Sequence, residues 1–428
     1  RRALFPDALD ECQVRVWLCG SSFDPFDDRH RVTGLDSCHA VPVSDPLRAR
    51  ALAADVIGRV LRSGAYSNVL TDQIGQDLSS QDRARLKALT FGVLRHLETI
   101  DALIADAANR DDLDDAVRDR LRVSTFELGY GDTPDPITVS AGVDMVRNSN
   151  PKAAGFANAV LRRIAREPKP ADTGLTLPGW LTASLAHHWP QSDIDDFARA
   201  SSIEPERIAR AREDAEPGFA GISGALELEP GPLPSDAVIQ DAASIAVGNT
   251  VEAGPGMRAI DLAAAPGGKT LHLLDQLGPE GLVVAMDKHR RRVATAALRV
   301  PGARWVIGDG TRPPFPPRTF DRVLLDAPCS GLGTLRRRPE IRFRIDQDDV
   351  EALAGLQRTM LAMAIDLVAH GGRLVYSVCT VTPEETVEIV APFDMRPADG
   401  PGKIWGKGRL LAPHLTGTDG MFISVFEG

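Results

Sequence analysis

From Met257 onward, short apolar stretches with the composition of β-strands alternate with longer stretches of helical periodicity. This pattern predicts strands at residues 257–263, 282–287, 304–309, 321–327, 372–379 and 420–426, and helices at residues 268–277, 289–299 and 349–369. Regular alternation of this kind is typical of a doubly wound α/β sheet with helices on both faces. The C-terminal half, residues 241–428, is therefore predicted to be a Rossmann-like domain.

Two cysteines lie at the ends of predicted strands. Cys329 follows the stretch that ends at Asp326 and Ala327, and Cys379 closes the stretch 372–379. Ligands and catalytic groups collect at the carboxyl ends of parallel strands, so both thiols are expected where chemistry takes place. Each could instead be a small buried core residue. The paired placement at strand ends favours a thiol nucleophile.

A Gly-rich turn after the first predicted strand has the features of a cofactor loop. Gly267 and Gly268 let the backbone approach a ligand closely, and a helix begins directly after them, so its free N–H groups favour an anion. The predicted cofactor-binding residues of this turn are Ala263, Ala264, Ala265, Pro266, Gly267, Gly268 and Lys269. The alternative, a plain loop, becomes less attractive because later strands also end in carboxylates.

Those carboxylates are Asp287, Asp309 and Asp326, which end three successive predicted strands. A carboxylate in the position of Asp287 commonly binds ribose hydroxyls, and Asp309 is placed to face an adenine edge. The turn has neither the G-x-G-x-x-G nor the G-x-x-x-x-G-K-[ST] pattern, which disfavours dinucleotides and nucleoside triphosphates. S-adenosyl-L-methionine is the cofactor that fits better.

The N-terminal half has a different pattern of apolar residues. Apolar residues recur at helical spacing between residues 45 and 168, as with Leu52, Val56 and Val60, and predict a compact helical bundle. One of its helices is expected over residues 83–103. Residues 1–44 lack such a pattern and are expected to be a poorly structured extension, whereas residues 175–240 are assigned to a linking subdomain.

Charge and cysteine content exclude several classes of protein. The 428 residues carry a formal net charge of −10, so any nucleic-acid contact must come from local basic clusters. The five cysteines show no close pairs or Cys/His sets, which argues against a disulfide framework and against a metal site. No apolar run reaches the roughly 20 residues that cross a bilayer, and no secretory leader opens the chain. A cytoplasmic monomer without membrane contact is expected.

Several motifs resemble those of the RNA cytosine-5 methyltransferases. They are Asp326-Ala327-Pro328-Cys329-Ser330-Gly331-Leu332-Gly333, Arg337-Arg338-Pro339-Glu340-Ile341, Tyr376-Ser377-Val378-Cys379-Thr380 and Pro383-Glu384-Glu385, together with the turn Ala264-Ala265-Pro266-Gly267-Gly268-Lys269-Thr270. The stretch 152–163 resembles the end of the helical domain of the antitermination factor NusB. A NusB-like helical domain before the catalytic domain is the arrangement of the bacterial 16S ribosomal RNA methyltransferases. The strand that opens this family's small RNA-contacting subdomain was not found in residues 201–233.

The resemblance implies a mechanism in which Cys379 adds to carbon 6 of the cytosine. Asp326 would hold the base edge, and Cys329 would assist product release. Arg337, Arg338 and Arg342 are the predicted RNA-binding residues, although a solvated charged loop is an alternative for them. Pro383 to Glu385 is expected to cap a helix, since first-turn carboxylates are favourable there.

The predicted product is 5-methylcytosine in RNA, with 16S ribosomal RNA as the expected substrate and rRNA processing as the role. A transfer RNA cytosine-5 methyltransferase and a non-catalytic RNA-binding assembly factor remain alternatives. An enzyme that methylates an exocyclic amino group would need an Asn/Asp-Pro-Pro-aromatic motif. The tetrad from Asp326 to Cys329 favours the carbon-5 reaction instead.

Overall fold

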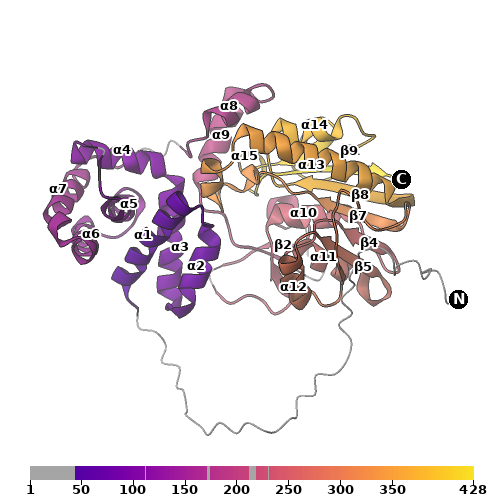
Figure 1. Ribbon diagram of the computed structural model, residues 1–428, viewed down its shortest axis with the longest axis horizontal. Coiled ribbons are helices and arrows are strands. Elements are labelled where there is room, and N and C mark those ends of the chain that lie inside the picture. Colours follow the sequence, from indigo (N-terminus) through magenta and orange to yellow (C-terminus); the bar gives the residue numbers. More distant parts are fainter. Residues whose placement is uncertain (1–43, 111, 171–173, 212–217, 230) are drawn as a thin grey trace, which may run out of the picture. The chain divides into compact units, whose positions relative to one another are not determined.

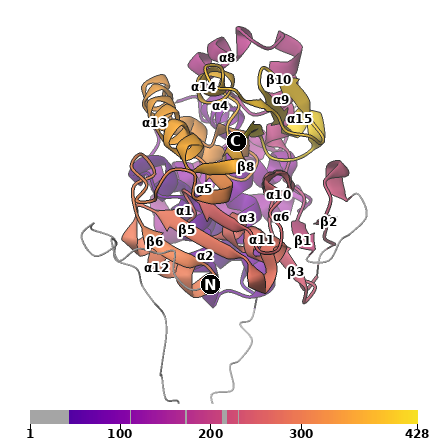
Figure 2. The same ribbon diagram turned by 90° about the vertical axis from the view of Figure 1, so that its right-hand side faces the viewer.

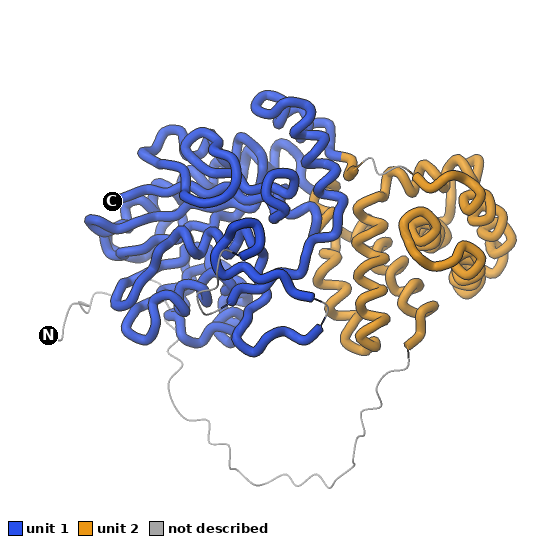
Figure 3. The backbone as a smooth tube through the Cα atoms, turned by 180° about the vertical axis from the view of Figure 1, so that it is seen from behind, with its two compact units in different colours: residues 1–17, 177–337, 344–428 blue, residues 18–176, 338–343 orange. Residues whose placement is uncertain are grey.

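The computed structural model describes residues 44–110, 112–170, 174–211, 218–229 and 231–428. The described chain forms two compact units, shown in different colours in Figure 3. One unit contains the residues up to Thr176 together with the short segment Arg338–Phe343, and the other contains Leu177–Arg337 and Arg344–Gly428. The extension expected at residues 1–44 lies, except for Ser44, outside the described residues.

The first unit is a helical bundle, as predicted. Its helices are α1 (Pro46–Ser63), α2 (Ser67–Ile74), α3 (Ser80–Arg95), α4 (Leu97–Ala108), α5 (Asp115–Tyr130), α6 (Asp135–Ser149) and α7 (Ala154–Ile164). The continuous helix expected over residues 83–103 is wrong, because His96 leaves helical geometry (φ −106°, ψ 23°) and divides it into α3 and α4. Apolar positions at helical spacing, among them Val56 and Val60, are buried in one core.

The second unit is built on a nine-stranded mixed sheet. Its strands follow the order β10 (Lys403–Trp405), β11 (Gly408–Leu411), β12 (Met421–Glu427), β8 (Val368–Val378), β7 (Phe320–Asp326), β4 (Arg258–Asp261), β5 (Leu282–Asp287) and β6 (Arg304–Ile307), and β9 (Arg396–Pro397) pairs with β12. The five strands from β8 to β6 are parallel, and β12 to β10 are antiparallel. The predicted Rossmann-like sheet preceded by a helical domain is confirmed.

Helices cover both faces of the sheet (Figure 1). Side chains of α10 (Ala242–Val251), α11 (Gly268–Leu277) and α12 (Arg290–Arg299) share a buried apolar cluster with Leu324 and Val375. Tyr376 points the other way, and its hydroxyl donates to Gln357 of α13 (Gln347–Asp366) at 3.1 Å. The long helix α13 therefore packs on the opposite face, beside β8 (Figure 2).

The linking region contains more structure than expected from its sequence. After α8 (Gly179–Ala186) and α9 (Gln191–Ser202), the strands β1 (Ile208–Ala211), β2 (Ala225–Glu227) and β3 (Ala237–Ile239) form an antiparallel sheet in the order β2-β1-β3. Residues 201–233 thus contain two strands, β1 and β2, that the sequence did not indicate. The four residues of β1 are Ile-Ala-Arg-Ala, and Arg210 at its centre interrupts the apolar pattern of a strand while lying buried beside Asp275.

Candidate active site

The loop between β4 and α11 forms an open cradle at the carboxyl edge of the sheet. Gly267 has a positive φ of 102°, which a glycine adopts without strain, and it directly precedes the first turn of α11. A Cβ added to Gly268 would meet no atom within 4 Å, so open space lies beside the backbone there. The first N–H groups of α11 have no capping side chain from Gly267 and are left for a ligand or water. Within the predicted cofactor loop, 263–269, Pro266 and Gly268 are exposed, whereas Ala264, Ala265 and Gly267 are buried. The exposed backbone before α11 is suited to an anionic group.

Two predicted cofactor carboxylates differ in their surroundings. Asp287, at the end of β5, is buried and accepts hydrogen bonds from the backbone N–H groups of Ala265 (3.3 Å) and His289 (2.9 Å). The Arg292 guanidinium also lies 3.6 Å from its Oδ2 atom. A carboxylate has about four acceptor sites, so capacity remains for a ribose hydroxyl. Asp309 is exposed two residues beyond β6, and the backbone and side chain of Thr311 donate to it, which lowers the pKa of Asp309.

The topological switch point of the sheet lies between β4 and β7, because the chain proceeds to β5 and β6 on one side and to β8 on the other. Here Lys269 Nζ donates to Asp326 Oδ2 at 2.7 Å, and Ser377 Oγ donates to the other oxygen at 2.8 Å. Burial acts to lower the pKa of Lys269, but the charge and hydrogen bond of Asp326 outweigh it and raise this pKa. The cofactor loop and the predicted base-holding residue are thereby joined by one ion pair.

The two predicted catalytic thiols meet. β7 and β8 are parallel neighbours with Asp326 opposite Ser377, so the loops that follow them start side by side. The Sγ atoms of Cys329 and Cys379 lie 3.4 Å apart, and both side chains are partly buried. The hydrogen bond with Cys379, followed by burial, raises the pKa of the Cys329 thiol well above its usual value. Cys329 consequently holds its proton at neutral pH.

The predicted RNA-binding arginines are largely engaged within the protein. Arg337 forms ion pairs with Asp419 (2.8 Å) and Asp241 (3.0 Å). Arg342 is buried in the helical unit, where it pairs with Glu98 at 2.8 Å. Arg338 is half-buried and has no ion-pair partner among the described residues. RNA contact by the three arginines stays a prediction, and burial of Arg342 speaks against a direct phosphate contact from that side chain.

Sequence reasoning missed the part played by Glu385. It lies in a short 3₁₀ turn, Pro383–Glu385, as the expected helix-capping motif would, and α14 (Val387–Val390) follows. Its fully buried carboxylate, however, accepts hydrogen bonds from Ser330, Gln357 and Thr382. Glu384 behaves differently, since it accepts from Ser184 of α8 and remains partly exposed.

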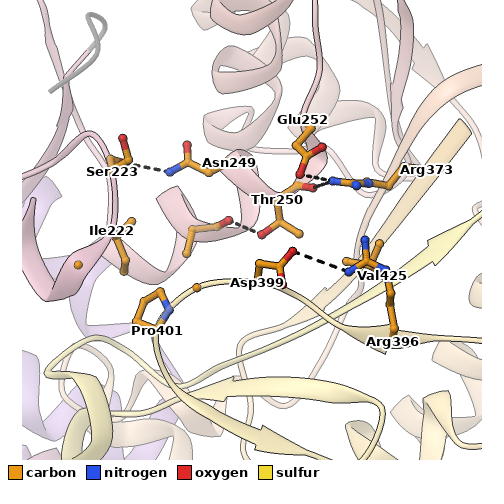
Figure 4. Close-up of a pocket in the computed structure, with 13 residues that line it drawn as sticks. Ile222, Ser223, Asn249, Thr250, Glu252, Arg373, Arg396, Asp399, Pro401 and Val425 are labelled. Carbon is orange, nitrogen blue, oxygen red and sulfur yellow. Dashed lines mark hydrogen bonds and ion pairs between the residues drawn. The ribbon is translucent and has the colours of Figure 1, made fainter. Parts of the chain in front are cut away.

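A separate cavity of about 260 Å³ opens near the other end of β8 (Figure 4). Its charged side chains are paired with opposite charges: Arg373 with Glu252 at 2.5 Å and Arg396 with Asp399 at 3.9 Å. Asn249 donates to the carbonyl of Ser223. Since the polar groups are occupied and the cysteines lie beyond the carboxyl ends of the strands, this cavity is distinct from the candidate active site.

Comparisons with known proteins agree with this geometry. A family model described as 16S rRNA methyltransferase RsmB/F matches residues 250–427, and the NusB family model matches residues 47–166. A relative from Thermus thermophilus, named Ribosomal RNA small subunit methyltransferase B, is 35% identical over 366 residues, covering 80% of this chain and 86% of that protein. The chain belongs to the RsmB/F methyltransferase family. The expected family is therefore confirmed.

Further similarities span most of this RsmB/F family member. A Bacillus subtilis relative, named Probable ribosomal RNA small subunit methyltransferase B, is 28% identical over 434 residues and covers 87% of this chain and 97% of that protein. A solved structure titled Crystal Structure of PH0851 matches with a TM-score of 0.70 at 21% identity, covering 90% of this chain and 99% of that one. The latter likeness shows the fold. Among the described residues, no helix has the length and apolar content of a membrane span, and no group of His, Cys, Asp or Glu is arranged to hold a metal ion.

Proposed function

We propose that this methyltransferase transfers a methyl group from S-adenosyl-L-methionine to carbon 5 of a cytosine in small-subunit ribosomal RNA, through a covalent bond between Cys379 and carbon 6. The observation that carries the proposal is the meeting of two thiols, 3.4 Å apart, beside the Lys269–Asp326 ion pair. A methyltransferase that acts on a nitrogen or oxygen of RNA needs no such thiol pair. Carbon 5 of cytosine is a poor nucleophile and does need activation.

Cys379 supplies that activation. Its thiolate attacks carbon 6, the new S–C6 bond forms, and the electrons of the C5=C6 double bond become available at carbon 5. Attraction between Lys269 and a Cys379 thiolate is one of the causes that raise the pKa of Lys269, so the cation favours the ionised nucleophile. After methylation, the proton of carbon 5 passes to water, the C5=C6 double bond forms again, and the S–C6 bond breaks to release the Cys379 thiolate.

Asp326 holds the base while the adduct forms. Lys269 and Ser377 donate to its two oxygens, which fixes the carboxyl group at the end of β7. Negative charge at this position stabilises a proton at N3 of the cytosine, and the ring then accepts electrons more readily during attack at carbon 6. The base must leave its stack to reach the thiol, as in other enzymes that act on a base.

Cys329 acts in the second half of the reaction. Its thiol keeps its proton because its pKa is raised, so it does not compete with Cys379 as nucleophile. Its Sγ lies 3.4 Å from that of Cys379 and thus next to the bond that must break. This placement supports assistance to elimination and product release.

The cofactor cradle fits S-adenosyl-L-methionine, which supplies the methyl group when bound. Residues 263–269 would contact it along the loop, Asp287 would accept from the ribose hydroxyls, and Asp309 would face the adenine. Asp287 has unused acceptor capacity, and space is open beside Gly268. The first turn of α11 favours the carboxylate of the methionine part.

The proposed substrate rests on the relatives and on the helical domain. The curated relatives bear the name ribosomal RNA small subunit methyltransferase B, and the helical unit matches the NusB family. Arg338 is the arginine of the 336–344 cluster that we propose contacts a phosphate. Arg162 and Arg166, exposed on or just after α7, would add further contacts.

The test uses two cysteine variants with 16S ribosomal RNA. Cys379→Ser should abolish methyl transfer, whereas Cys329→Ser should accumulate a covalent protein–RNA adduct that migrates slowly on a denaturing gel and disappears on protease treatment. Bisulfite sequencing of the RNA then identifies the methylated cytosine. Full activity of Cys379→Ser, or an adduct in that variant and none in Cys329→Ser, would overturn the assigned roles. Methylation of transfer RNA but not of 16S RNA would overturn the proposed substrate.

A further inference from the structure

Glu385 is a fully buried carboxylate next to the loops that carry the two cysteines. Its Oε1 atom accepts from the backbone N–H of Ser330 at 2.8 Å and from Nε2 of Gln357 at 3.0 Å. Its Oε2 atom accepts from the hydroxyls of Ser330 at 2.5 Å and Thr382 at 2.8 Å. The four acceptor positions of one carboxylate are thus filled by four donors.

Three of these four donors belong to the cysteine loops. Ser330 directly follows Cys329, and both its backbone and its side chain donate to Glu385. The Ser330 proton is used in this bond, so Thr380 Oγ1, 2.8 Å away, must donate to Ser330 Oγ. Thr380 in turn directly follows Cys379. One hydrogen bond therefore joins the residue after one cysteine to the residue after the other, and a second continues from Ser330 to the Glu385 carboxylate.

Gln357 of α13 fixes the carboxylate from the other side. Its Nε2 donates both to Glu385 and to the carbonyl of Pro328, the residue before Cys329, at 2.9 Å. The Tyr376 hydroxyl shares its one proton between the carbonyl of Glu385 at 2.9 Å and Oε1 of Gln357 at 3.1 Å. The network consequently contacts the Cys329 loop at Pro328, before the cysteine, and at Ser330, after it. Hydrogen bonds from Tyr376 and Gln357 connect it to β8 and α13.

A carboxylate at this depth requires an explanation. Removing a carboxylate from water is costly, and an apolar side chain of similar size would fill the same space. Because each of these donors has an acceptor, the network is rigid. A buried network with unpaired polar groups would be less stable than an apolar core. Because three of the four donors come from the two loops that hold the reacting groups, rigidity here sets the relation between the two sulfur atoms.

We propose that Glu385 is a positioning residue that holds the Cys329 and Cys379 loops at the sulfur separation required for nucleophilic attack and release. The inference rests on the proposed function of the two thiols, and it adds a residue that touches neither the RNA base nor the cofactor. The negative charge of Glu385 also contributes to the raised pKa of Cys329, after the larger effects of the Cys379 hydrogen bond, burial and the Cys379 charge. The Glu385 charge is thus one of the smaller effects that favour the protonated thiol at Cys329.

The experiment compares Glu385→Gln with Glu384→Gln in the full chain. Glutamine keeps the size of Glu385 but replaces one acceptor atom by a donor, so one pair of loop contacts is lost. Glu384 is the matched control, because it is the adjacent glutamate and contacts Ser184 rather than a cysteine loop. We expect Glu385→Gln to lower kcat on the order of tenfold to a hundredfold, with the KM for RNA and the Kd for S-adenosyl-L-methionine within about twofold of wild type. Glu384→Gln should leave all three unchanged.

A second readout is the reactivity of the thiols without RNA. Loss of the Glu385 charge lowers the pKa of Cys329, so iodoacetamide should alkylate Cys329 faster in Glu385→Gln, with the pH profile of labelling moved to lower pH. Mass spectrometry of tryptic peptides separates Cys329 from Cys379. This measurement needs no methyl transfer: if Cys379 proves not to be the nucleophile, the proposed function fails while the alkylation result still decides the role of Glu385.

Wild-type kcat together with an unchanged alkylation profile in Glu385→Gln overturns the proposal. If Glu385→Gln does not fold, Ser330→Ala decides instead, because it removes the link between Glu385 and Thr380 and leaves the bonds from Gln357 and Thr382 in place. We expect Ser330→Ala to change kcat and Cys329 labelling in the same directions by smaller factors. A Ser330→Ala variant with wild-type kcat and labelling would equally overturn the proposal.

Discussion

Lys269 Nζ lies 2.7 Å from Asp326 Oδ2, and this ion pair joins the first turn of α11 to the carboxyl end of β7. One partner belongs to the cofactor loop and the other to the strand end that is proposed to hold the base. Both side chains are largely shielded from water, so the pair is screened less than a surface ion pair. A substitution of either Lys269 or Asp326 is therefore expected to affect both the cofactor loop and the carboxyl end of β7.

Lys269→Met should sharply reduce methyl transfer. The variant leaves Asp326 with Ser377 as its remaining hydrogen-bond donor and removes the cation that favours a Cys379 thiolate. Loss of a hydrogen bond to a charged group costs about 1.5–3 kcal/mol, roughly a tenfold to hundredfold fall in the single-turnover rate. Lys403→Met is the control, since the exposed Lys403–Asp193 pair at 3.2 Å is worth little. Equal rates for the two variants would contradict the role assigned to Lys269.

Asp287→Ala should weaken binding of S-adenosyl-L-methionine. The variant removes the proposed ribose acceptor and also leaves the N–H groups of Ala265 and His289 without it. The expected loss is about 1–3 kcal/mol, or roughly a fivefold to 150-fold higher Kd by isothermal calorimetry. Asp348→Ala, on the exposed start of α13, is the control and should bind as wild type does. A wild-type Kd for Asp287→Ala would remove Asp287 from the cofactor site.

Stability should fall as the pH rises from about 4 to about 7 because of Asp261. This carboxyl group is buried, and burial raises its pKa from 3.8 to about 7, against the opposing hydrogen bond from Thr270. A raised pKa means that the folded chain binds the proton more tightly. The resulting stabilisation is complete below about pH 4 and is lost as the pH approaches and passes about 7.

Asp261→Asn should therefore flatten this dependence. The amide oxygen still accepts from Thr270 but carries no charge at any pH in the range. Between pH 4 and 7 the wild-type free energy of unfolding should decline relative to the variant by up to about 1.36 kcal/mol per pH unit. Urea unfolding of both proteins at pH 5, 6, 7 and 8, followed by a probe in the catalytic unit, measures the difference. Parallel stability curves would show that Asp261 does not titrate as described.

The elements of the catalytic domain were predictable because local sequence determines them. The strand β5 is a continuous apolar run that ends in Asp287, and the second half of β7, residues 323–325, is a shorter apolar run that ends in Asp326. Parallel strands place such ends at one edge of the sheet. The meeting of Cys329 and Cys379 follows from the same rule. In contrast, Glu385 is 55 residues from its partner Ser330, and its surroundings in sequence are those of a helix start. Nothing in a local pattern indicates which distant donors a buried carboxylate will find.

For the arginines between residues 336 and 344, the sequence predicted more exposed charge than the structure shows. Five arginines between residues 336 and 344 read as a basic surface when only their neighbours are considered. The acids that pair with Arg337 lie 82 and 96 residues away, and Glu98 lies 244 residues from Arg342. Side chains already engaged in short ion pairs release few counterions on RNA binding, so the expected electrostatic contribution of the cluster is smaller than its charge count.

This has a measurable consequence for RNA affinity. Arg338→Ala should reduce the slope of log K against log salt by roughly 0.7 to 0.9, the value for one phosphate contact. The triple variant of Arg337, Arg338 and Arg342 should reduce the slope by about the value of one phosphate contact rather than three. Filter binding or fluorescence anisotropy between about 50 and 200 mM salt covers the useful range. If the slope of the triple variant falls by the value of three phosphate contacts, all three arginines bind RNA. If the slope of Arg338→Ala is unchanged, Arg338 does not contact a phosphate.

The segment Arg338–Phe343 should act as a structural part of the helical unit. Glu340 is fully buried there, and its Oε1 accepts from the backbone N–H (3.1 Å) and the hydroxyl (2.7 Å) of Ser67, the first residue of α2. Arg342 in the same segment donates to the carbonyl of Leu94 at 2.9 Å near the end of α3. These bonds predict that α2 depends on Glu340 for its N-terminal support, since Tyr66 at its N-cap position provides no side-chain hydrogen bond.

Glu340→Ala should therefore speed hydrogen exchange of the α2 amides, because bonds to a charged acceptor are each worth about 1.5–3 kcal/mol. Ser67→Ala removes the hydroxyl contact alone and should have a smaller effect. The double variant should exchange no faster than Glu340→Ala, since both changes remove the same interaction. Glu351→Ala, on the exposed face of α13, serves as the control. If the effects of the two single variants simply add, or if α2 exchanges at the wild-type rate without Glu340, the segment does not support the helix through this contact.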